Sequence, residues 1–106
     1  MRFLPFQANI LAMNNYNFLT KTPREIDQLI ASRIRGIRKR RKISQKRLSE
    51  KSGVSLGSVK RFEQSGDISL ISLTKIAIAL EIEDELEHLF EKVPFLSIEE
   101  VAYAND

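Results

Sequence analysis

The stretch ISQKRLSEKSGVSLGSVKRFEQSG, residues 43–66, decides the fold of this chain. It holds two short runs with helical spacing, and each run follows a serine, Ser44 or Ser55. A serine directly before a helix accepts a hydrogen bond from a backbone N–H of the first turn. Gly53, between the runs, fits the left-handed residue that ends a helix. The stretch therefore predicts two helices joined by about three residues, the connection of a helix-turn-helix.

The same serine pattern recurs further along the chain. Ile68-Ser69 with Leu73, and Leu96-Ser97 with Val101, repeat an apolar residue, a serine and an apolar residue four positions later. This is the pattern of an N-cap with a hydrophobic staple. It predicts one helix over about 70–80 and a short helix after Ser97.

Upstream of residue 43, the sequence Thr22-Pro23-Arg24-Glu25 predicts a capping box, with proline at the first helical position. Isoleucines then recur at helical spacing and form one apolar stripe, at Ile26, Ile30, Ile34 and Ile37. The helix should begin near Pro23 and end in the basic run over residues 38–42, where cations complement the helix dipole.

Downstream, the acidic residues 83–85 favour a helix start, and that helix should end around Phe90, before Pro94. No strand pattern competes, so we expect an all-α fold. We assign residues 1–21 to an N-terminal extension, 22–91 to a five-helix domain, and 92–106 to a tail that contains the short helix.

The first residues have two interpretations. An arginine followed by apolar residues resembles a secretory leader, but Pro5, Gln7 and Asn9 interrupt it and no cleavage motif follows. We favour the alternative that Met13 is the natural start and that residues 1–12 are an upstream extension. A natural start at Met1 is the other alternative.

Charge divides the chain into two halves. Residues 24–61 carry thirteen Lys or Arg and three acids, whereas residues 62–106 carry two bases and eleven acids. The first half should attract a polyanion. There is no cysteine, which excludes disulfides and thiolate metal sites. Apolar runs are too short to cross a bilayer, and we expect a cytoplasmic protein.

The helix after Ser55 has one apolar and one polar face. At 100° per residue, Phe62 falls on the side of Val59, which predicts that this side meets the core. The opposite strip has chemistry that suits duplex DNA, since glycine permits close approach, arginine forks onto guanine and lysine reaches phosphate. This strip consists of Gly57, Lys60, Arg61 and Gln64.

Residues 26–90 resemble the XRE-type regulators, which include Cro and the lambda-type phage repressors. The resemblance is carried by Arg33, Ile34, Arg38, Ile43-Ser44-Gln45, Leu48, Gly53-Val54-Ser55, Val59 and Phe62-Glu63. It implies a lambda-repressor-like fold and double-stranded DNA as the partner. It also implies that Arg38 pairs with Glu63, and that Gln45 meets a phosphate while it braces the recognition helix.

In that family the first residues of the recognition helix and the position of Arg61 read bases. Leu56 and Gly57 depart from the usual hydrogen-bonding residues, so Leu56 is expected to touch a thymine methyl and Arg61 to be the main polar reader. The base-reading candidates are Ser55, Leu56, Gly57, Lys60 and Arg61. The phosphate candidates are Arg40, Arg41, Lys42, Gln45, Lys46, Arg47, Ser58 and Gln64.

Three functions are consistent with these residues. The first is a repressor that binds a two-fold operator as a homodimer. The second follows from a narrower resemblance of residues 54–70 to HipB-like antitoxins, encoded beside HipA-type kinase toxins, and adds binding of a toxin partner by the acidic half or by residues 95–101. The third is RNA binding, which ranks last because exposed aromatic platforms are expected to be missing.

Enzymatic and metal chemistry find no support in the sequence. The motifs GxxxxGK[ST], G-x-S-x-G and HExxH are absent. His88 is the only histidine and is expected to decorate the surface. The four carboxylates of residues 83–87 lack EF-hand spacing and fit a solvated helix face. We therefore expect neither catalysis nor a cofactor.

Overall fold

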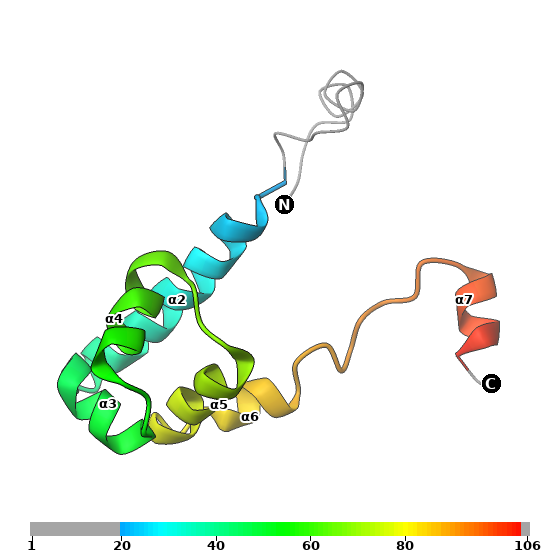
Figure 1. Ribbon diagram of the computed structural model, residues 1–106. Coiled ribbons are helices and arrows are strands. Elements are labelled where there is room, and N and C mark those ends of the chain that lie inside the picture. Colours follow the sequence, from blue (N-terminus) through cyan, green and yellow to red (C-terminus); the bar gives the residue numbers. More distant parts are fainter. Residues whose placement is uncertain (1–19, 105–106) are drawn as a thin grey trace.

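The computed structural model describes residues 20–104, and no strand occurs among them. The predicted all-α class is confirmed. Five helices, α2 to α6, lie next to one another, and the short α7 lies apart at the end of an extended segment (Figure 1). Met13 and all of the expected N-terminal extension except Thr20 and Lys21 lie outside the described residues.

Helix α2 spans Pro23–Arg40 and begins with the predicted capping box. The hydroxyl of Thr22 accepts from the backbone N–H of Glu25 at 3.1 Å, and the Glu25 carboxylate accepts from the N–H of Thr22 at 2.8 Å. These two bonds satisfy backbone donors that the helix itself leaves free. The basic residues Arg38, Lys39 and Arg40 form the last turn, as predicted.

The predicted helix-turn-helix is confirmed. Helix α3 spans Gln45–Ser52, and Gly53 follows it in the left-handed conformation, with φ of 78°. Helix α4 spans Leu56–Ser65, so three residues join the two helices. The turn is held by two side chains, because the Ser49 hydroxyl donates to the carbonyl of Val54 at 2.6 Å and Ser52 accepts from the N–H of Val54 at 3.1 Å.

The remaining helix starts also agree with the serine pattern. Helix α5 spans Leu70–Ala79 and is capped by Ser69, and α7 spans Ile98–Tyr103 and is capped by Ser97. Helix α6, Glu83–Glu87, has no side-chain cap.

The prediction that the acidic helix reaches Phe90 was wrong, since α6 ends at Glu87. The backbone continues in turns, and Phe90 has a φ of 65°. Leu89 and Phe90 are both exposed. Because no apolar neighbour from residues 20–104 covers these side chains, packing does not stabilise a further helical turn.

The core lies where α2, α3, α4 and α5 meet. Helix α2 packs against α4, α3 packs against both α4 and α5, and α5 packs against α6 (Figure 1). The buried cluster consists of Ala31, Ile34, Leu48, Val54, Val59, Phe62, Ile76 and Leu80. Both helices of the helix-turn-helix, α3 and α4, thus contribute at least one buried side chain to a shared core.

The isoleucine stripe of α2 is covered only in its second half. Ile34 is buried, whereas Ile26 and Ile30 are exposed. Figure 1 shows that the first turns of α2 project beyond the other helices. Helical spacing predicted which residues share a face, but the length of the bundle decides how much of that face is buried.

Candidate nucleic-acid interface

The orientation of α4 agrees with the prediction from helical geometry. Val59 is 0% exposed and Phe62 is 1% exposed, so these side chains fix the inner face of the helix. Gly57, Lys60, Arg61 and Gln64 are all exposed on the other face. The structure therefore brings together the polar strip that the sequence analysis identified.

The first turn of α4 is held by two serines. The Ser55 hydroxyl accepts from the backbone N–H of Ser58 at 3.1 Å and donates to the Ser58 hydroxyl at 2.8 Å. Ser55 is exposed, whereas Ser58 and Leu56 are half-buried. Within this turn the side chains are either short or partly covered, which leaves its backbone accessible at Gly57.

A buried carboxylate ties α4 to the two preceding helices. Glu63 accepts from Arg38 through two bonds, Nε to Oε2 at 2.6 Å and Nη2 to Oε1 at 2.9 Å. Gln45 donates its Nε2 to Oε1 of Glu63 at 3.0 Å, and Arg38 Nη1 donates to the carbonyl of Ile43 at 2.8 Å. The pair that the resemblance implied is therefore present, and so is the bracing contact of Gln45. The phosphate role of Gln45 stays a prediction.

The surroundings of Glu63 set its protonation. Burial favours the neutral carboxyl, but the hydrogen bonds from Arg38 and Gln45 and the charges of Arg38 and Arg35 outweigh it, so the pKa of Glu63 lies below its ordinary value. Glu63 is accordingly a carboxylate at neutral pH. The charged carboxylate of Glu63 accepts two hydrogen bonds from Arg38, and so it pairs the charge of this buried guanidinium.

Arg35 belongs to this site and was missed from the sequence. Its Nε lies 3.8 Å from Oε1 of Glu63, and its side chain is more than half exposed. A shallow polar groove is lined by Arg35, Gln45, Lys60, Glu63 and Gln64. The spacing in the sequence could have identified Arg35, since it precedes Arg38 by three residues and so lies on the same side of α2.

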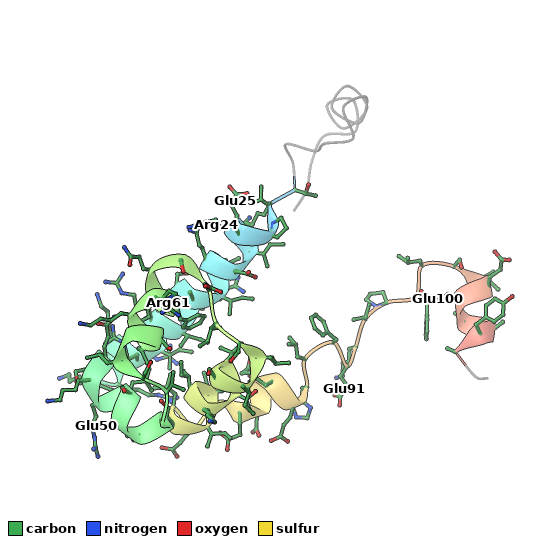
Figure 2. The ribbon with its side chains drawn as sticks, viewed as in Figure 1. Arg24, Glu25, Glu50, Arg61, Glu91 and Glu100 are labelled. Atoms are coloured by element: carbon green, nitrogen blue, oxygen red, sulfur yellow. The ribbon has the colours of Figure 1, made fainter. Side chains whose placement is uncertain are left out.

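The candidate phosphate-binding cations are all exposed. Arg40, Arg41 and Lys42 form the end of α2 and the turn after it, and Lys46 and Arg47 lie in the first turn of α3. Arg47 Nη1 lies 3.6 Å from Oε1 of Glu50, an exposed pair. In Figure 2, nitrogen-bearing side chains gather on the side of the bundle formed by α2, α3 and α4, which includes Arg61.

Three aromatic side chains are exposed among the described residues, although the sequence analysis expected no exposed aromatic platforms. Phe90, Phe95 and Tyr103 are exposed. They lie in the acidic C-terminal part of the chain and not beside the basic strip. Stacking platforms for single strands work together with a positive groove, so these residues do not form such a site.

The described part of the chain offers no metal site. Residues 20–104 contain no group of three or more His, Asp or Glu that could hold a metal ion. His88 is exposed, as predicted, with its Nδ1 3.3 Å from Oε1 of Glu91. None of the described helices combines the length and apolar character needed to span a membrane.

A comparison with protein families supplies the family of the chain. The sequence model described as HTH_3, Helix-turn-helix, matches residues 34–86, which is half of the chain. No curated protein sequence matches the chain significantly. The match spans the turn and both of its helices, the buried Arg38–Glu63 pair and the whole of α5. Proteins of this family are DNA-binding regulators and typically are not enzymes. The chain belongs to the XRE-type helix-turn-helix family of DNA-binding transcription regulators.

Proposed function

We propose that this protein is a cytoplasmic repressor that binds a palindromic operator as a homodimer, with α4 in the major groove. The observation that carries the proposal is the fixed orientation of α4. Val59 and Phe62 are fully buried, so Lys60 and Arg61 must face outward together. A helix held in this way presents the same side chains to every duplex it meets.

The interface divides into residues that read bases and residues that bind the backbone. In this proposal Arg61 forks onto guanine O6 and N7, supported by Ser55, Leu56, Gly57 and Lys60 in the groove. Backbone phosphates meet Arg40, Arg41, Lys42, Gln45, Lys46, Arg47, Ser58 and Gln64. Gln45 is well suited to this, because Glu63 occupies only one of the donors on its amide nitrogen.

The outer face of α5 supports self-association. Leu70, Ile71 and Ile78 are large apolar residues that stay exposed on this helix. Grouped exposed apolar residues commonly mark protein interfaces. In sedimentation equilibrium we expect a dimer for the unaltered protein and a monomer for Ile78→Glu. A protein that stays monomeric on its DNA would contradict the homodimer.

The central experiment compares two arginines that carry the same charge. DNA is first selected from a random-sequence library by the unaltered protein, and Arg61→Ala and Arg24→Ala are then titrated with that duplex and with its single-base variants. Arg24 is exposed in the first turn of α2 and so lies on a different helix from Arg61. We expect Arg61→Ala to lose about 1–3 kcal/mol of preference at one base pair, and Arg24→Ala to keep the preference.

Salt dependence and transcription test the rest of the proposal. Log affinity should fall with log salt by about 0.9 for each phosphate neutralised. A reporter promoter that carries the selected site should be transcribed less when the protein is produced. If Arg61→Ala kept its full base preference, Arg61 would not be the base-reading residue. A rise in transcription would contradict repression.

The second candidate function is an antitoxin of a HipA-type pair, in which the same chain also binds a toxin. The observation that favours it is the C-terminal segment, where Leu96 is 91% exposed and Ile98 is 87% exposed. A helix of six residues is unstable on its own, so a partner protein would stabilise α7. Co-purification with the product of an adjacent gene is expected. If no adjacent gene product co-purifies, only the repressor remains.

A further inference from the structure

Gly57 occupies the first turn of α4 although no neighbour in the described part of the chain requires a glycine there. A Cβ atom added at Gly57 would meet no atom of residues 20–104 within 4 Å beyond its own helix and sequence neighbours. Its backbone is ordinary helix, unlike Gly53 and Gly66, which adopt φ of 78° and 84°. Neither packing nor backbone conformation therefore accounts for this residue.

The glycine also has a cost. Glycine in a helix is less favourable than alanine by up to about 1 kcal/mol, because it loses more backbone freedom on folding. Gly36 of α2 is similarly exposed and unconstrained. At 100° per residue, however, Gly36 points away from Ala31 and Ile34, which face the core, and so away from α4. Only Gly57 lies on the face that carries Arg61.

The position of Arg61 gives the open space at Gly57 a use. Residues four apart lie on the same side of a helix, and helical side chains lean toward the N-terminus. By this geometry Arg61 leans toward the turn that contains Gly57, and residue 57 itself carries no side chain. The long Arg61 and the bare backbone of residue 57 are thus both exposed on the same side of α4.

We propose that Gly57 determines specificity, because it lets the backbone of the first turn of α4 touch the edges of base pairs while the Arg61 guanidinium reaches the neighbouring base. This inference rests on the proposed function. A Cβ at residue 57 would hold the helix away from the floor of the groove by the size of a methyl group. The hydrogen bonds of Arg61, which depend on short distances and good angles, would lengthen.

The experiment uses the full chain with Gly57→Ala, and with Gly36→Ala as the matched control. Affinities are measured for the duplex that the unaltered protein selects from a random-sequence library and for an unrelated duplex. We expect Gly57→Ala to lose about tenfold or more on the selected duplex and nothing on the unrelated one. The thermal unfolding midpoint should stay equal or rise in both variants, and Gly36→Ala should keep its affinity.

A double-variant cycle tests the link to Arg61. If Arg61 reaches its base only through the space at residue 57, Gly57→Ala should weaken binding less in an Arg61→Ala background than in the unaltered protein. Additive losses would refute that link. Unchanged affinity of Gly57→Ala, a lowered unfolding midpoint, or an equal loss in Gly36→Ala would each overturn the inference. The proposed function fails separately, if the unaltered protein does not distinguish its selected duplex from the unrelated one.

Discussion

Replacing Arg38 by methionine tests the buried connection that orients α4. Arg38 is 7% exposed, and the side chain of its partner Glu63 is 4% exposed. Methionine preserves much of the volume but removes both bonds to the carboxylate and the bond to the carbonyl of Ile43. Glu63 would then keep only Gln45 and the exposed Arg35, at 3.0 and 3.8 Å.

The magnitude follows from burial. Removing one partner of a buried ion pair costs about 3–5 kcal/mol, because the remaining charge stays buried without compensation. A domain of about seventy residues has a free energy of unfolding of about 4–10 kcal/mol. The variant should therefore lose a third or more of its stability, and at the lower end of this range it should be largely unfolded.

The assay is urea unfolding followed by far-ultraviolet circular dichroism. The matched variant carries both Arg38→Met and Glu63→Met, which removes the stranded charge and should restore most of the stability. A loss below about 1 kcal/mol in the single variant would show that the pair is not effectively buried. A double variant no more stable than the single one would refute the argument that the unpaired carboxylate causes the loss.

Three further predictions concern stability. The pKa of Glu63 is lowered from its ordinary value of 4.5, so the contribution of Glu63 to folding stability is complete above that pH and is lost as the pH falls through the lower folded pKa. In urea unfolding at a series of pH values, the free energy of unfolding should therefore fall less with acidity in the Arg38→Met, Glu63→Met double variant than in the unaltered protein. Gly66→Ala would place a Cβ 2.7 Å from the carbonyl carbon of Asp27, whereas the Cβ of Gly53→Ala would meet no described atom within 4 Å. In both variants the left-handed conformation of alanine should lower the free energy of unfolding by about 1–2 kcal/mol. The contact with Asp27 should lower it by about 1–3 kcal/mol more in Gly66→Ala, as measured by urea unfolding. Ser55→Ala should cost about 1 kcal/mol through loss of the N-cap bond, measured in the same way.

Each of these has an outcome that contradicts it. Parallel pH profiles for the unaltered protein and the double variant would mean that Glu63 does not control acid stability. Equal losses in Gly66→Ala and Gly53→Ala would show that the contact with Asp27 relaxes at no cost. Unchanged unfolding of Ser55→Ala would mean that the cap bond contributes nothing to the stability of α4.

The sequence alone was sufficient for most of the secondary structure. The capping box at Thr22 and the four serine caps each depend on residues within four positions, so their hydrogen bonds form wherever the helix forms. The inner and outer faces of α4 were also predictable, because helical geometry places Val59 and Phe62 on one side. Amino-acid identity likewise determined the basic character of residues 24–61.

The tertiary structure decided what depends on distant neighbours. It exposed Ile26 and Ile30, because the bundle is shorter than α2. It ended α6 at Glu87, because no described residue covers Phe90. It placed Arg35 beside Glu63 and made the second left-handed glycine, Gly66, a close contact of Asp27. Local hydrogen bonds and periodicity are properties of a segment, whereas burial, ion pairing and free space are properties of what packs against it.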